Sequence, residues 1–124
     1  MSLKRSGEMY LETILILSQR GEPVHAVDVA KHMNFSKPSV SRALGLLRDG
    51  GYLEADAQGH LILSPSGAEV AHKIYERHRL MTEFLVYLGV DRDVAVEDAC
   101  KMEHDISEES FEAFKVYARK LGLI

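Results

Sequence analysis

The sequence lacks most features that would point to a secreted, membrane-spanning or zinc-finger protein. It contains one cysteine, Cys100, so no disulfide can form within the chain, as is typical of a reducing compartment. No run of 18 apolar residues predicts a membrane span. The first residues are not followed by the apolar stretch of a signal peptide, and paired Cys/His ligands at zinc-finger spacing are missing. These absences predict a cytoplasmic protein.

A net positive charge is also missing, because the formal net charge is −4. The charge is unevenly distributed: residues 1–50 carry seven Lys/Arg against five Asp/Glu, whereas residues 64–124 carry eight against twelve. DNA is bound by a local basic face rather than by the total charge. The charge therefore permits DNA binding by the N-terminal part without proving it. A chain of 124 residues, 46% of them hydrophobic, is predicted to form one compact domain or two small subdomains.

The N-terminal part has the pattern of three helices followed by a β-hairpin. The helices are predicted at residues 7–19, 24–33 and 37–48. Asn34 and Phe35 form a tight turn before the third helix, which Ser36 caps and whose first turn tolerates Pro38. Strands are predicted at residues 52–55 and 60–63, with Gly59 in the loop between them. This order predicts a winged helix-turn-helix domain at residues 1–71.

The C-terminal part is predicted to be all-helical, forming a second domain at residues 72–124. Ser64 caps a long helix that starts at Pro65 and extends to about Leu88. A second helix runs from Asp93 to His104, and Ser107 caps the last one. The buried stripe of the last helix is predicted to comprise Phe111, Phe114, Ala118 and Leu121.

The start of the third helix is the candidate DNA-contact surface. Its residues are Ser36, Lys37, Pro38, Ser39, Ser41 and Arg42. Hydroxyl groups and cations on one face are what phosphate and base-edge contacts need. The alternative is an ordinary solvated face, and the hairpin that follows favours DNA binding over it.

A second candidate site is formed by Cys100, Glu103 and His104. On a helix these positions share one face, and a thiolate, a carboxylate and an imidazole are suitable ligands for a divalent transition metal. A half-buried cysteine beside an exposed Glu-His pair explains the same pattern equally well. A nucleophilic cysteine activated by His104 is a third alternative, but no glycine-rich oxyanion turn accompanies it.

Three further residues have ordinary explanations when taken alone. Met9 and Glu12 share a face of the first helix, where a methionine usually fills the core and a glutamate is usually solvated. His78 is a lone histidine on the long helix, and such a residue is more often structural than a ligand.

Five segments together carry a family resemblance over nearly the whole chain. They are Glu-Met-Tyr-Leu-Glu-Thr-Ile at residues 8–14, Ser-Lys-Pro-Ser-Val-Ser at 36–41, Leu-Ile-Leu-Ser-Pro-Ser-Gly at 61–67, Arg-His-Arg-Leu at 77–80 and Glu-Asp-Ala-Cys-Lys-Met-Glu-His at 97–104. In this order they resemble the diphtheria toxin repressor family of metal-dependent transcriptional regulators, which includes the manganese transport regulators.

The resemblance implies a homodimer formed by the helices after the wing, and it implies a set of metal ligands. Met9, Cys100, Glu103 and His104 match the primary site of the iron-responsive branch. Glu12 and His78 match ligands of the manganese-responsive branch. Thr82 and Val96 stand where iron-type members have a Glu and a His of an ancillary site, so that site is expected to be incomplete. An SH3-like third domain and the last helix of the manganese branch are expected to be missing.

The function implied is that of a metal-dependent repressor that regulates metal-ion homeostasis by binding operator DNA as a dimer. Soft sulfur ligands shift the expected metal from Mn²⁺ towards Fe²⁺, so Fe²⁺ is expected first and Mn²⁺ next, with Zn²⁺, Co²⁺ or Ni²⁺ competing in vitro. No enzymatic activity, organic substrate or membrane partner is expected. Two alternatives stay open. One is a winged-helix regulator that senses no metal, and the other is a small enzyme with a reactive thiol at Cys100.

Overall fold

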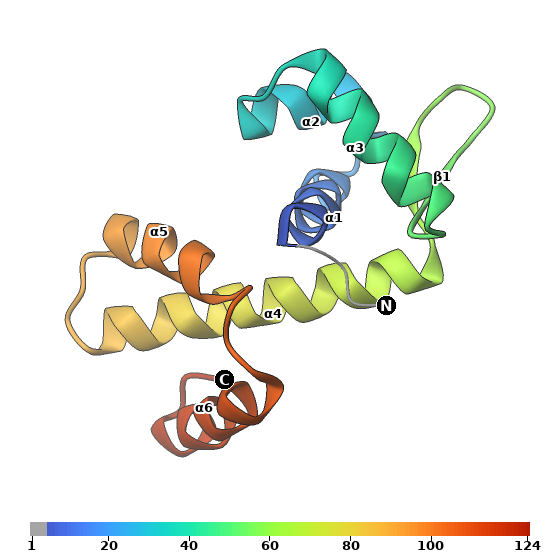
Figure 1. The fold of residues 1–124 in the computed structure, drawn as a ribbon. Helices are drawn as coiled ribbons and strands as arrows, with labels where there is room; N and C mark the ends of the chain where they lie inside the picture. Colours follow the sequence, from blue (N-terminus) through green and yellow to red (C-terminus); the bar gives the residue numbers. More distant parts are fainter. Residues whose placement is uncertain (1–4) are drawn as a thin grey trace. The chain divides into compact units, whose positions relative to one another are not determined.

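The computed structural model describes residues 5–124 (Figure 1). The chain divides into two compact units, with the boundary between His72 and Lys73. This boundary lies inside a long helix, α4 (Pro65–Tyr87). The part up to His72 is called unit 1 and the part from Lys73 is called unit 2.

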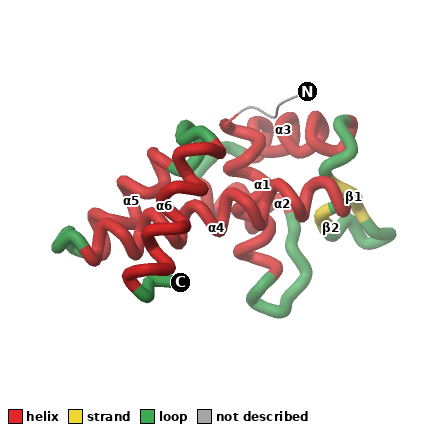
Figure 2. Tube along the Cα trace, turned by 90° about the horizontal axis from the view of Figure 1, so that it is seen from below, coloured by secondary structure: helices red, strands yellow, loops and turns green. Residues whose placement is uncertain are grey.

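Unit 1 contains three helices and a small antiparallel sheet ahead of the start of α4 (Figure 2). The elements are α1 (Arg5–Ser18), α2 (Ala26–Met33), α3 (Lys37–Asp49), β1 (Leu53–Ala55) and β2 (Leu61–Leu63). The three helices contact one another, β1 contacts α3, and β2 contacts α1. This is the predicted winged helix-turn-helix.

The turn between α2 and α3 forms because two local signals agree. Asn34 adopts the left-handed conformation, with φ 58°, which asparagine tolerates better than most residues. The Phe35 N–H then donates to the Ala30 carbonyl at 3.1 Å. Ser36 ends the turn by accepting the Ser39 N–H at its Oγ, 3.3 Å away. The predicted N-cap of α3 is thus confirmed.

The wing is held by backbone contacts on both sides. Leu53 pairs with Leu63 and Ala55 with Leu61, and the Leu61 N–H also donates to the Val24 carbonyl at 2.8 Å. On the other side, the first turn of α4 lies against the backbone of Tyr52. A Cβ atom at Gly67 would come within 2.0 Å of the Tyr52 carbonyl oxygen, so only glycine fits there.

Unit 2 is an all-helical unit built from the rest of α4, α5 (Arg92–Met102) and α6 (Glu108–Leu121). Its core comprises Leu80, Met81, Ala99, Phe111 and Ala118, with Phe84, Ile106 and Leu123 packed against it. Ser107 caps α6 as predicted, because its Oγ accepts the Ser110 N–H at 3.1 Å.

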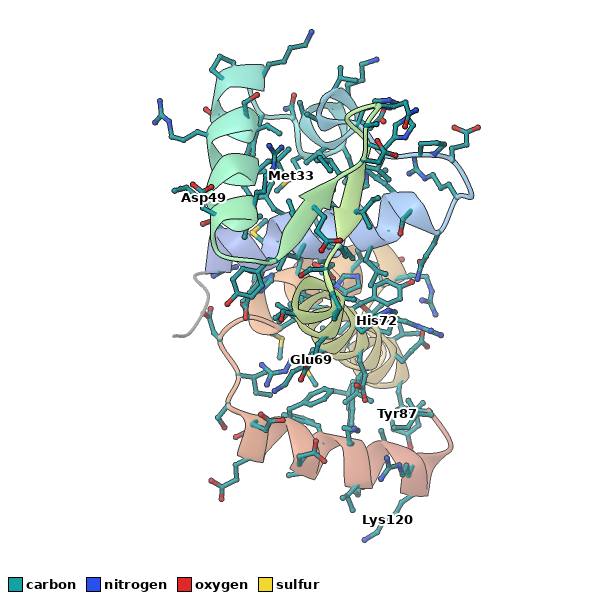
Figure 3. The ribbon with its side chains drawn as sticks, turned by 90° about the vertical axis from the view of Figure 1, so that its right-hand side faces the viewer. Met33, Asp49, Glu69, His72, Tyr87 and Lys120 are labelled. Atoms are coloured by element: carbon teal, nitrogen blue, oxygen red, sulfur yellow. The ribbon has the colours of Figure 1, made fainter. Side chains whose placement is uncertain are left out.

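Two predictions about unit 2 were wrong. The helix α5 ends at Met102, two residues before the predicted end at His104, and Glu103 is its C-cap. Phe114 is 36% exposed and does not belong to the buried stripe of α6. Another exposed aromatic residue of unit 2 is Tyr87, the last residue of α4. Figure 3 labels Tyr87 and also Lys120 of α6.

Within residues 5–124, no helix is both long enough and apolar enough to cross a membrane.

Candidate metal centre and nucleic-acid interface

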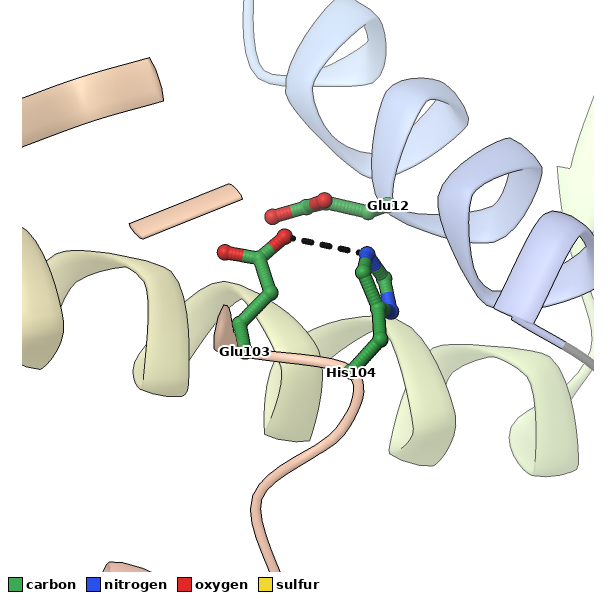
Figure 4. A group of neighbouring side chains, drawn as sticks. All are labelled: Glu12, Glu103 and His104. Carbon is green, nitrogen blue, oxygen red and sulfur yellow. Dashed lines mark ion pairs between the residues drawn. The ribbon is translucent and has the colours of Figure 1, made fainter. Parts of the chain in front are cut away.

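The turn that connects α5 to α6 carries two of the predicted metal ligands. Glu103 is the C-cap of α5, and its N–H still donates to the Ala99 carbonyl at 2.9 Å. His104 follows outside the helix. Successive side chains on a helix diverge, but here the chain has left the helix, and His104 Nε2 lies 3.2 Å from Glu103 Oε1 (Figure 4). Both side chains are fully buried, with 0% of their surface exposed.

A third predicted ligand reaches the same carboxylate from α4. His78 Nδ1 lies 2.7 Å from Glu103 Oε2, so the two oxygens of Glu103 face two different imidazoles. Burying a carboxylate is costly unless polar or charged groups compensate for the lost hydration. One carboxylate and two imidazoles form a donor set that suits a divalent transition metal. The chemistry of this buried cluster therefore fits such an ion.

The other predicted ligands lie on helices of both units. Cys100 is half-buried on α5 in unit 2. Met9 and Glu12 lie on α1 in unit 1, where Met9 is half-buried and Glu12 is buried. Figure 4 also draws Glu12. The structure of unit 2 by itself brings together His78, Glu103 and His104.

Thr82 and Val96 are the two residues that the resemblance places at an incomplete ancillary site. The Thr82 hydroxyl is buried and donates to the His78 carbonyl of the preceding turn at 2.8 Å. Val96 is exposed on α5 and its side chain has no donor atom.

The predicted DNA-contact residues all lie on the exposed side of α3. Ser36, Lys37, Pro38, Ser39, Ser41 and Arg42 are exposed. The opposite side of the helix packs into the core of unit 1 through Val40, Leu44 and Leu47. No acidic residue lies in the first turn, so the cations at this end of the helix are not opposed locally. This face is suited to a polyanion.

Sequence reasoning gave no individual role to Arg77. Its guanidinium is buried and donates to backbone carbonyls of the turn that carries Glu103 and His104. The sequence offers only a weak sign of this role, which is a charged residue next to His78. The carbonyl groups that Arg77 binds lie 26 and 29 residues further along the chain.

Two family models together cover most of the chain. Residues 2–61 match the N-terminal DNA-binding domain of iron-dependent repressors, and residues 64–121 match their metal-binding and dimerisation domain.

Individual relatives agree with these matches. An HTH-type transcriptional regulator of Methanocaldococcus jannaschii is 33% identical over 120 residues, which span 95% of this chain and 96% of that protein. The transcriptional regulator MntR of Escherichia coli is 34% identical over 113 residues, spanning 91% of this chain and 73% of MntR. The solved structure of the manganese regulator SloR superposes with a TM-score of 0.81 at 29% identity. It covers 100% of this chain, which spans 56% of the SloR chain.

Proposed function

The chain belongs to the iron-dependent repressor family, and we propose that it represses transcription by binding operator DNA as a homodimer when a divalent transition metal is bound. The observation that carries this proposal is the cluster in unit 2 where the buried carboxylate of Glu103 lies 2.7 Å from the half-buried His78 imidazole and 3.2 Å from the buried His104 imidazole. The exposed polar and basic face of α3 in unit 1 would contact the operator DNA. The genes controlled would be those of metal-ion homeostasis.

The proposed ligand set is the one that the family resemblance implies. It comprises Met9, Glu12, His78, Cys100, Glu103 and His104. Glu12, Glu103 and His104 offer ligand atoms of the type that divalent ions accept. The burial of Glu12 within α1 supports its inclusion, because a glutamate without a buried role is normally solvated.

Fe²⁺ is the proposed metal, with Mn²⁺ next. Carboxylates suit Mn²⁺ and imidazoles suit several ions, so the sulfur atoms of Cys100 and Met9 would decide between the two metals. Cys100→Ala should therefore weaken Fe²⁺ binding more than Mn²⁺ binding. Equal losses for the two ions would remove Cys100 from the ligand set.

The proposed mechanism is linkage between metal and DNA. The ligand set that the resemblance implies comes from α1 in unit 1 and from α4, α5 and the α5–α6 turn in unit 2, so one ion bound by all of them would restrain both units. An ion that binds the DNA-competent arrangement more tightly shifts the population towards it. In the homodimer, this arrangement would set two α3 helices about 34 Å apart, one turn of DNA.

The dimer face is proposed to lie on the exposed aromatic side of unit 2. The Phe84 ring packs edge-on against Phe114, with centroids 5.4 Å apart, and stacks on Tyr117 at 6.1 Å. Phe114 and Tyr117 are both exposed, as is Leu88 at the end of α4. Contiguous exposed apolar surface of this kind marks interfaces between proteins.

The functional division is proposed to follow the sequence prediction, with DNA binding at residues 1–71 and metal binding and dimerisation at 72–124. The proposed place of action is the cytoplasm. In the DNA-binding part, the residues proposed to contact operator DNA are Ser36, Lys37, Pro38, Ser39, Ser41 and Arg42.

A pair of double variants tests the proposal. Glu103→Ala with His104→Ala should abolish metal-dependent DNA binding, whereas Lys37→Ala with Arg42→Ala should abolish DNA binding and leave metal affinity unchanged. The DNA probe is a duplex selected by the wild-type protein from a random pool in Fe²⁺ (without oxygen) or Mn²⁺. Binding is measured by fluorescence anisotropy, with folding checked by circular dichroism.

His32→Asn is the control, since this histidine is exposed on α2 and should change neither affinity. If the wild type binds the duplex equally well in chelator, the protein is a regulator that senses no metal. If the Glu103/His104 variant keeps the full response to metal, the proposed site is wrong.

A further inference from the structure

We propose that Arg77 is a positioning residue of the metal centre, which holds the backbone of the turn at residues 103–106 so that Glu103 and His104 are presented in one fixed geometry. This inference rests on the proposed function, because it concerns the ligands of the proposed site. It assigns Arg77 no contact with the metal.

The guanidinium reaches two carbonyl groups of the turn at once. Arg77 Nη1 donates to the Glu103 carbonyl at 3.2 Å and to the Ile106 carbonyl at 2.8 Å. The Nη1 group has two hydrogens, so both bonds can form together. The last carbonyls of a helix lack intrahelical donors, and a cation there also interacts favourably with the helix dipole. Arg77 thus supplies both the donors and the charge that the end of α5 needs.

The burial of Arg77 is expensive if its role is only to fill space. Only 7% of its surface is exposed, and arginine is rarely buried to this degree. Its guanidinium lies over the Phe111 ring, 5.2 Å from the centroid, so it is sandwiched between the turn and the core of unit 2. An unbranched apolar side chain would fill this space at a lower desolvation cost. What such a side chain could not provide is a pair of hydrogen bonds to the turn.

Consecutive residues of α4 hold the two ends of Glu103. Arg77 binds its backbone carbonyl, and His78 Nδ1 lies 2.7 Å from its carboxylate. Glu103 is therefore held both at its backbone and at its carboxylate. Ligands must be held within about 0.5 Å of the productive geometry, and loss of residues that orient ligands costs about 10- to 100-fold in metal affinity.

Two substitutions separate positioning from packing. Arg77→Met keeps an unbranched chain but removes the donors, and it should raise the Kd for Mn²⁺ about 10- to 100-fold. Arg77→Lys keeps a cation with donors but has a shorter reach, so it should recover part of the loss. The ligand-field absorption of bound Co²⁺ should broaden or shift in Arg77→Met, which a purely structural role would not cause.

Lys115→Met is the matched control. Lys115 also bridges α4 and α6, through Glu76 at 2.9 Å, and also lies over Phe111, 5.7 Å from its centroid. No contact of the described structure joins it to the turn, so its loss should lower the melting temperature without changing the Kd for Mn²⁺.

Mn²⁺ affinity of Arg77→Met within twofold of the wild type would overturn the inference. If that variant does not fold, Arg77→Leu, which also lacks donors, decides under the same twofold limit. A wild-type protein that binds neither Mn²⁺ nor Co²⁺ would instead refute the proposed function. The two failures are therefore distinguishable.

Discussion

Among the described residues, unit 1 buries the polar residues Glu12, Thr13 and Ser64, whereas unit 2 buries Arg77, Thr82 and Glu103, so only unit 2 buries a guanidinium as well as a carboxylate. Ser64 serves local structure, because its hydroxyl donates to the Gly51 carbonyl at 2.6 Å and accepts the Gly67 N–H at 3.1 Å. Arg77 and Glu103 have no such local explanation. Natural sequences break local rules mainly where function requires it. The buried charged groups therefore place the proposed metal-binding chemistry mainly in unit 2, and Glu12 is the buried charged residue of unit 1.

Core truncations should have the largest effect and should test whether the two units unfold independently. Leu11→Ala in unit 1 and Leu80→Ala in unit 2 each remove a fully or nearly fully buried side chain. Each should lower the free energy of unfolding by about 2–5 kcal/mol. Urea denaturation, monitored by circular dichroism, measures the free energy of unfolding.

Leu46→Ala is the control for this pair, because Leu46 is 68% exposed, and a change within about 0.5 kcal/mol is expected. Two transitions, with each truncation moving only one of them, would show that the units are energetically separate. One shared transition would show that they unfold together.

Two helical glycines of unit 1 should respond in opposite directions. Gly67→Ala places a methyl group 2.0 Å from the Tyr52 carbonyl oxygen, so it should destabilise unit 1 by about 1–3 kcal/mol or more. Gly45→Ala meets nothing within 4 Å and should stabilise α3 by about 0.5–1 kcal/mol. Thermal unfolding of the two variants provides the comparison. A loss of stability in Gly45→Ala would contradict the open space seen beside α3.

The N-caps provide a matched pair across the units. Ser36→Ala and Ser107→Ala each remove a hydroxyl that accepts a backbone N–H, and each should cost about 1 kcal/mol. Only Ser36→Ala should also weaken DNA binding, since Ser107 belongs to unit 2. Aspartate at position 107 should restore the cap. Equal losses of DNA affinity in both variants would contradict the assignment of DNA binding to unit 1.

The smallest effect expected is a contribution to acid stability from one carboxylate in each unit. The His60 N–H donates to Asp56 and is the main reason for its lowered pKa. The Lys73 ammonium, 2.7 Å away, does the same to the pKa of Glu108. Because both folded pKa values lie below the unfolded ones, the stabilisation is present above the unfolded pKa and is lost as the pH falls through the folded pKa.

Asp56→Asn should reduce the fall in melting temperature below pH 3.8, and Glu108→Gln should reduce the fall below pH 4.5, because these are the ordinary pKa values of the two groups. Glu108 is exposed and Asp56 is partly exposed to solvent, so the effect should be small and should weaken in salt. Identical pH profiles for wild type and both variants would exclude these contributions.

The order of helices and strands could be predicted because its signals are local. Ser36 and Ser107 lie three residues before the amides that they accept, and Gly59 lies in the loop that it marks. Such signals can be recognised in a single window of sequence. The agreement in unit 1 is correspondingly close, with the strand and helix ends displaced by only a few residues.

The end of α5 could not be predicted in this way. No glycine or proline occurs between Cys100 and Ser107, so the sequence pattern predicts a helix that continues through His104. The helix ends at Met102, and the carbonyls beyond it bind Arg77, which lies on a different helix. A contact across 26 residues has no signature in a local window. The approach of His78 to Glu103 was likewise implied only by the resemblance.

The two bonds from Arg77 also make the turn at residues 103–106 intolerant of changes in length. One inserted residue would displace the following Cα atoms by up to about 3.8 Å, which is more than either hydrogen bond can absorb. Insertions and deletions should cost less at the exposed turns around Gly59 and Gly89, where the side-chain pairs that span the loop, Asp56–His60 and Glu83–Arg92, lie at or near the surface. The α5–α6 turn therefore works as a fixed-length spacer, and engineered linkers or tags belong at the other two turns.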